Sequence, residues 1–158
     1  MNSSAIWKLS VTVGVSLAAG FVGSLFMAPS ASTWYAGLLK PALNPPSWVF
    51  APVWTTLYVL MGIAAFLVWQ HGWERREVRA ALAVFAVQLA LNALWSVVFF
   101  GWHAPGAAFM DILLLWLAIA ATVSLFSKVS RTAAWLLAPY VLWVSFAMYL
   151  NVGIWLLN

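Results

Sequence analysis

Five long apolar runs constrain this chain more than any other feature of its sequence. A helix needs about 20 mostly apolar residues to cross a bilayer, because each residue rises about 1.5 Å and the hydrocarbon layer is about 30 Å thick. None of the runs alternates apolar and polar residues as a membrane β-strand does. The sequence therefore predicts an all-α membrane protein, a five-transmembrane-helix bundle in one domain over residues 1–158. Its spans cover approximately residues 5–27, 47–70, 80–101, 107–126 and 132–157.

The composition excludes several other classes of protein. Of 158 residues, 66% are hydrophobic and 6% charged, whereas a soluble domain carries about 25% charged residues. The seven basic residues are scattered, so no nucleic-acid surface is expected. Cysteine is absent, and His71 and His103 fall in connections on opposite sides of the membrane. No metal or haem site is therefore expected.

The first apolar run could also be read as a cleaved signal peptide, because Lys8 precedes it. However, its uncharged part, residues 9–28, is longer than the roughly 7–15 residues of such signals. We therefore interpret it as a span.

Basic residues indicate the orientation. With five spans, the side that holds the N-terminus also holds the second and fourth connections. That side carries Lys8, Arg75, Arg76, Arg79, Lys128 and Arg131, and the other side carries Lys40. The positive-inside rule then predicts a cytoplasmic N-terminus and an external C-terminus, in a bacterial inner membrane or an equivalent one.

The first connection, residues 28–46, is unusually long, and long connections often act as lids. Trp34 and Tyr35 make it too apolar for a solvated linker, so we expect it to pack over the mouth of the bundle. Asn44, before two prolines, is expected to cap the second span. Pro52 is expected to kink that span.

The fifth span is predicted to supply a binding slot. Pro139 should bend the helix, because proline cannot donate the usual backbone hydrogen bond. Tyr140, Trp143 and Ala147 follow at a spacing that places them on one stripe. Two large rings beside a small side chain would form a slot with flat walls.

Polar residues inside the spans give two further candidates. Gln88, Asn92 and Ser96 recur every fourth residue and should face the bundle interior, where ligand contact and hydrogen bonding between helices are equally open readings. Asp111 is the one carboxylate within a span. We expect it, near a helix start, to hold a neighbouring helix or loop rather than to relay protons.

The sequence contains no conventional catalytic motif. Glu74 and Glu77 lie in an exposed connection and cannot pair with Asp111, and no glycine-rich phosphate loop is present. Indole is abundant instead, with 12 tryptophans. Some should anchor span ends at the membrane interface: Trp7, Trp73 and Trp102.

Motifs along the whole chain carry a family resemblance. They are Trp34-Tyr35, Lys40-Pro41, Asn44-Pro45-Pro46, Trp54, Asn92, Asp111 and the run from Trp135 to Trp143. Together with the span count and the long first connection, they make the chain resemble the TspO/MBR family of tryptophan-rich sensory proteins. Mitochondrial relatives in that family are called translocator protein or peripheral benzodiazepine receptor. The resemblance implies a ligand cavity under the first connection and a homodimer.

The resemblance also implies ligands and site residues. Family members bind protoporphyrin IX and related tetrapyrroles, and isoquinoline carboxamide or benzodiazepine-type molecules. Some bacterial members degrade porphyrin in light and oxygen through tryptophans that match Trp34 and Trp143. No covalently bound cofactor is implied. The family's pocket walls match Tyr35, Pro45, Trp54, Tyr58, Asn92, Tyr140 and Ala147, to which the sequence adds Gln88 and, as the cation on the lid side, Lys40.

Two departures limit the resemblance. Animal members carry a cholesterol-recognition pattern with a basic residue after a tyrosine near the end of the fifth span, and none follows Tyr149. Cholesterol is therefore not an expected partner. Leu43 stands where an aromatic residue is common, which should weaken the grip of the lid.

Small residues repeated every fourth position suggest faces for the homodimer. The pairs are Gly14/Ala18, Ser16/Gly20 and Ala19/Gly23 in the first span and Ala86/Ala90 in the third.

Three functions stay open at this point. The leading one is a porphyrin-binding sensor that also promotes light-dependent porphyrin degradation. The second is a tetrapyrrole transporter, although the sequence shows neither an inverted repeat nor paired broken helices. The third is a non-catalytic membrane scaffold.

Overall fold

The computed structural model describes residues 3–158, and every regular element in that range is helical. Five of its helical segments are long and apolar enough to cross a membrane, which confirms the predicted all-α bundle. The elements are α1 (Ser3–Ala31), α2 (Trp34–Gly37), the 3₁₀-helix η1 (Ser47–Val49), α3 (Phe50–Trp69), α4 (Arg76–Ser96), the π-helix η2 (Val97–Gly101), α5 (Pro105–Val129), α6 (Arg131–Leu136) and α7 (Ala138–Leu157).

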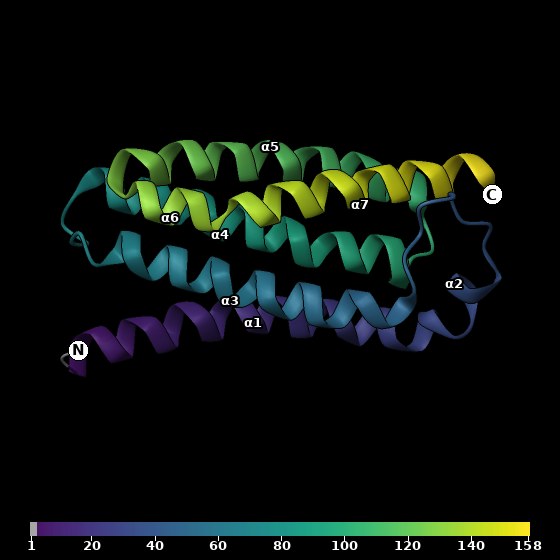
Figure 1. The fold of residues 1–158 in the computed structure, drawn as a ribbon, viewed down its shortest axis with the longest axis horizontal. Helices are drawn as coiled ribbons and strands as arrows, with labels where there is room; N and C mark the ends of the chain where they lie inside the picture. The colour runs from purple at the N-terminus through teal and green to yellow at the C-terminus, as the bar shows by residue number, and fades with distance from the viewer. Residues whose placement is uncertain (1–2) are drawn as a thin grey trace.

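The spans form one bundle, in which each packs against at least two others. Helix α1 packs against α3 and α4, α3 against α6, and α5 against α4, α6 and α7. Figure 1 shows the helices running lengthwise, with the two marked chain ends at opposite ends of the bundle and α2 at the same end as the C-terminus. Because α1 packs against two other spans, the first apolar run is part of the bundle.

The first connection is shorter than predicted, because α1 continues through Pro29 to Ala31. Residues 32–46 then form the lid, which includes the single turn α2. The prediction that Asn44 caps the second span is wrong: Pro46 precedes η1, and no side chain caps it. Pro52 lies in the first turn of α3, directly after η1. A proline is tolerated there, since first-turn N–H groups have few partners within the helix.

The fifth span is broken beside Pro139, as predicted. Helix α6 ends at Leu136, and α7 begins at Ala138 with Pro139 in its first turn. The break divides the span into a short segment that packs against α3 and a long one that packs against α5.

The third span ends in a π-helix that the sequence pattern does not predict. In η2 the backbone widens, and the Trp102 N–H donates to the Val97 carbonyl five residues earlier (2.9 Å). Phe99 and Phe100 are buried there and pack near Tyr35 of the lid. The π turn therefore presents two successive aromatic rings at the lid end.

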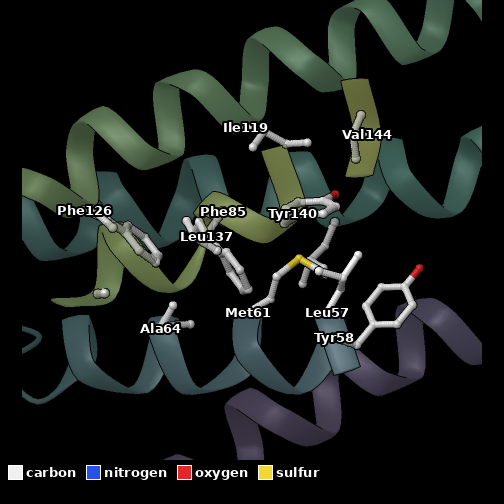
Figure 2. Close-up of a cluster of buried hydrophobic side chains, with 14 of the residues drawn as sticks. Leu57, Tyr58, Met61, Ala64, Phe85, Ile119, Phe126, Leu137, Tyr140 and Val144 are labelled. Atoms are coloured by element: carbon white, nitrogen blue, oxygen red, sulfur yellow. The ribbon is translucent and has the colours of Figure 1, made fainter. Parts of the chain in front are cut away.

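The main apolar core fills the end of the bundle away from the lid. Met61, Ile119, Phe126 and Val144 are almost completely buried in it. Figure 2 shows these side chains meeting from α3, α5 and α7, with the Tyr58 ring at one edge of the cluster. This end is densely packed with side chains.

Small residues of α1 pack within the chain, which removes two of the suggested dimer faces. Gly20 faces the Tyr58 ring, and Gly23 faces the Ser96 hydroxyl, leaving no room for a Cβ at either glycine. Ser16 is fully buried. The Gly14/Ala18 pair and the Ala86/Ala90 pair are exposed instead, so these two faces stay as predictions.

Candidate functional site

A cavity of about 630 Å³ lies under the lid, within the size range of sites for drug-sized ligands. All spans except α5 contribute to its wall, which is mostly apolar. The lining residues are Leu17, Gly20, Phe21, Gly23, Ser24, Met27 and Ala31 of α1, Ser32 and Tyr35 of the lid, Ser47, Phe50, Ala51, Trp54, Thr55 and Tyr58 of η1 and α3, Asn92, Trp95, Ser96, Phe99 and Phe100 of α4 and η2, and Trp143, Ala147, Leu150, Asn151 and Ile154 of α7.

A buried polar network forms the floor of this cavity. The Tyr58 hydroxyl donates to Asn92 Oδ1, and Asn92 Nδ2 donates to the Tyr140 hydroxyl (3.1 Å). Tyr140 in turn donates to Gln88 Oε1 (2.8 Å). Buried polar atoms are costly unless paired, so this chain of bonds explains how four polar side chains fit inside an apolar bundle. The predicted polar face of the third span does point inward.

Aromatic rings line the walls above the network. Trp54 stacks on Tyr58 with ring centroids 5.6 Å apart, and Phe50 meets Trp143 edge to face at 6.0 Å. Trp95 is fixed by a hydrogen bond from its Nε1 to Asn151 Oδ1 (2.9 Å). Flat rings at different angles can enclose a flat aromatic ligand from several sides.

Tyr35 anchors the lid above the cavity. Its hydroxyl donates to Asn44 Oδ1 (3.0 Å), so Asn44 stabilises the lid and does not cap a helix. Burial raises the pKa of the Tyr35 phenol, and the Asn44 bond opposes that shift. Lys40 Nζ lies 4.8 Å from the centre of the Tyr35 ring and donates to the Leu38 carbonyl (3.0 Å). The lysine is therefore occupied by the lid itself.

Trp34 faces another part of the structure. Its ring stacks on His103 with centroids 4.4 Å apart and meets Phe99 edge to face at 5.6 Å. His103 has a positive φ of 53°, and its Nε2 lies 3.2 Å from the hydroxyl oxygen of Ser30. Trp34 thus ties the lid to the connection between η2 and α5.

Asn158 fastens the middle of the lid to the end of α7. Its side-chain amide accepts a hydrogen bond from the Leu39 N–H and donates one to the Leu39 carbonyl, both at 3.0 Å. Pro41 packs against Gly153 so closely that a Cβ there would approach it to 3.0 Å. We call this set of contacts the lid clasp.

The structure brings part of the predicted site to the cavity wall. Six of the predicted residues line it: Tyr35, Trp54, Tyr58, Asn92, Trp143 and Ala147. Gln88 and Tyr140 lie behind Asn92 in the network. Trp34, Lys40 and Pro45 belong to the lid but are not among the lining residues.

Sequence reasoning missed several lining residues. Trp95 and Phe99 follow Asn92 at three and seven residues and so continue the predicted polar face, a signal that could have identified them. The contribution of α1 carried no such signal, because its cavity-facing residues other than Phe21 have small or aliphatic side chains that do not differ from the rest of the span.

Asp111 lies apart from the residues that line the cavity. It is buried in α5 as the seventh residue of that helix, somewhat farther from the helix start than predicted. Its Oδ2 atom has no hydrogen-bond partner in the structure. This oxygen therefore makes no hydrogen bond to a neighbouring helix or loop, and the predicted role of Asp111 in holding one stays a prediction. Among residues 3–158, no group of three His, Cys, Asp or Glu side chains could hold a metal ion.

Comparison with known proteins gives one consistent result. A family model described as TspO/MBR family matches residues 12–156. "Tryptophan-rich protein TspO" of Chlorobaculum tepidum is 48% identical over 153 residues, which cover 97% of both chains. The protein of the same name from Archaeoglobus fulgidus is 45% identical over 97% of this chain and 98% of its own. "Translocator protein" of Homo sapiens is 44% identical over 85% of this chain and 80% of its own.

Proposed function

Because this chain belongs to the TspO/MBR family, we propose that it is a membrane sensor whose cavity under the lid binds protoporphyrin IX or a related tetrapyrrole. The observation that carries this proposal is the cavity itself, about 630 Å³ of mostly apolar space walled by indole and phenol rings. A tetrapyrrole is a flat aromatic ring with an apolar face on each side. Stacking and burial would therefore supply its affinity. An isoquinoline carboxamide would suit the same walls.

The carboxylates of a porphyrin would need polar partners near the mouth. Asn92 already pairs with two phenols, so it is a weaker candidate than the sequence suggested. Ser32 and Ser47 line the cavity at opposite ends of the lid and can offer hydroxyl groups. Lys40 could join them if it left the lid carbonyls.

Titration of the purified protein with protoporphyrin IX tests the proposal. A sensor with one cavity should quench tryptophan fluorescence and shift the porphyrin absorption band in a saturable way, at one porphyrin per chain. A scaffold that acts through its outer faces would give only weak, unsaturable partitioning into the detergent or lipid.

The solid core favours a sensor over a transporter. The cavity ends at the Tyr58–Asn92–Tyr140–Gln88 network, and beyond it the main core packs from α3 to α7. A transported tetrapyrrole would have to separate these packed helices. Flux of protoporphyrin across sealed vesicles, measured beside binding, separates the two functions.

Light-dependent porphyrin degradation would depend on Trp143 more than on Trp34, because Trp143 lines the cavity and Trp34 does not. Trp143→Phe keeps most of the apolar contact but removes the readily oxidised indole. We expect porphyrin loss in light and air to slow at least about fivefold, while affinity falls by less than about fivefold, the equivalent of ~1 kcal/mol. Trp34→Phe should slow it less. Trp135→Phe, at an exposed indole, is the control.

Unchanged degradation in both Trp143→Phe and Trp34→Phe would remove the photochemical role from these indoles. Porphyrin loss is followed by absorbance at fixed light dose, and binding is measured separately in the dark.

The orientation and assembly are further proposals. Six basic residues lie near the start of α1 or beside the α3–α4 and α5–α6 connections, and Figure 1 shows these parts at the end of the bundle that holds the N-terminus. This placement supports a cytoplasmic N-terminus in a bacterial inner membrane. A reporter fused after Asn158 should then be active only on the external side, and cytoplasmic activity would contradict this. A homodimer would use the exposed Gly14/Ala18 or Ala86/Ala90 face.

A further inference from the structure

The backbones of α3 and α7 do not pack closely against each other beside the cavity. Helix α3 packs closely against α6, but after the break at Leu137 the chain follows α5 as α7. Figure 1 shows α3 and α7 separating toward the end that carries the lid. Side chains, not close backbone packing, therefore close this side of the cavity.

A groove of about 750 Å³ lies on the outer side of this gap. Both helices that form it are membrane spans, so the groove opens toward the hydrocarbon layer. Its lining is almost wholly apolar: Pro52, Val53, Thr56, Leu57 and Leu60 from α3, and Pro139, Leu142, Trp143 and Phe146 from α7. The one hydroxyl among them, that of Thr56, donates to the Pro52 carbonyl of its own helix.

Trp143 lines both the groove and the cavity, so its indole is the partition between them. Ring contacts hold it on both sides, with Phe50 at 6.0 Å and Phe146 at 5.6 Å between centroids. Its Nε1 atom is buried and has no hydrogen-bond partner. By contrast, the indoles of Trp95 and Trp116 donate to Asn151 and Ser145. Turning Trp143 breaks no hydrogen bond.

We propose that the groove is the bilayer-side entrance of the cavity. A flat, apolar aromatic molecule dissolved in the hydrocarbon layer settles in the groove and reaches the cavity when the Trp143 indole turns aside. Three features support this route: the groove and cavity share Trp143, the groove is apolar like the hydrocarbon layer that it faces, and the lid clasp of Asn158 fastens the opening at the lid. The identity of the ligand rests on the proposed function; the route does not.

Access to the cavity can be measured without any porphyrin, because the chain has no cysteine of its own. Ala147→Cys places a single thiol on the cavity wall. In lipid nanodiscs, its rate of modification is measured with N-cyclohexylmaleimide, which dissolves in the bilayer, and with a charged sulfonate methanethiosulfonate, which does not. The apolar reagent reports the bilayer route, and the charged reagent reports the lid.

Thr56→Trp fills the groove from α3, and Leu142→Trp fills it from α7 in case the first variant folds poorly. Either should slow the apolar reagent about tenfold, which corresponds to a modest rise in the entry barrier. Trp143→Ala, which removes the partition, should accelerate it. Leu117→Trp, at an exposed position of α5 that lines neither space, is the matched control and should change nothing.

The opposite pattern would overturn the route. If both groove-filling variants react as fast as the parent, while Asn158→Ala accelerates both reagents, ligands enter under the lid. Protoporphyrin IX supplied in the bilayer gives a second readout: Thr56→Trp should slow association and dissociation equally and leave the equilibrium affinity unchanged. A parent protein that binds no porphyrin but shows the cysteine pattern would refute the proposed ligand and keep the entrance.

Discussion

Replacing Gly62 with alanine is expected to lower the free energy of unfolding by about 2 to 3 kcal/mol, because overpacking of a close helix contact cannot be relieved by a side chain here. A Cβ on Gly62 would lie 2.5 Å from Cα and 2.9 Å from the backbone N of Val13 in α1. Helices α1 and α3 would have to move apart. Small residues at such crossings supply much of the association between membrane helices, which lack a hydrophobic driving force in lipid.

Gly14 provides the control, since the same substitution in α1 meets nothing within 4 Å. Gly14→Ala should be neutral or stabilise by up to about 1 kcal/mol, because glycine is a poor helix former. Unfolding in increasing SDS, followed by circular dichroism in detergent, measures both variants. Equal stability of Gly62→Ala and the parent would show that the α1–α3 contact is looser than described.

Ala147→Leu is expected to abolish porphyrin binding or weaken it at least about tenfold, ~1.4 kcal/mol. Ala147 lines the cavity one turn after Trp143, so a leucine would project into the space beside the indole. Ala147 is a buried residue at the border between the main core and the cavity, so the added carbon atoms can extend into the open space of the cavity. The fold should therefore survive, and the loss of affinity can be assigned to the blocked site.

Porphyrin titration by fluorescence quenching measures this loss, and circular dichroism checks the fold. Ala121→Leu makes the same change at an exposed position of α5 and should bind like the parent. Normal porphyrin affinity in Ala147→Leu would mean that the ligand occupies some other place on the protein.

Sequence patterns predicted the spans well because a long apolar run has only one arrangement compatible with a bilayer. The exact ends of the helices could not be predicted as well. Helix α1 continues through Pro29, where the apolar run ends. The third span widens into the π-helix η2, in which Phe99 packs against Phe100, Trp95 and Tyr35 of the lid. These changes at helix ends depend on tertiary contacts, which the local sequence pattern does not encode.

The candidate site also has a part that the sequence predicted and a part that it did not. Gln88 and Asn92 were placed correctly in the interior, because their spacing on one helix defines a face. Asn44 was expected to cap the second span, but it accepts a hydrogen bond from Tyr35 within the lid, a contact that the local sequence does not indicate. Trp34 is oriented by His103, 69 residues later in the chain, a contact that spacing along one helix cannot reveal.

The two ends of the bundle should differ in the free energy that local unfolding costs, because one end is densely packed and the other encloses the cavity. Phe126, Val68 and Ala133 are completely buried at the end away from the lid, whereas the other end encloses the cavity. Regions with dense apolar contacts open only with the whole protein, and hollow regions open at lower cost. Backbone amides of α6 and the second half of α3 should thus exchange hydrogen far more slowly than those of α2 and η1. A ligand that fills the hollow end would even out this gradient, so slower amide exchange there would itself be a signal of occupancy, readable by any partner that senses the rigidity of the lid.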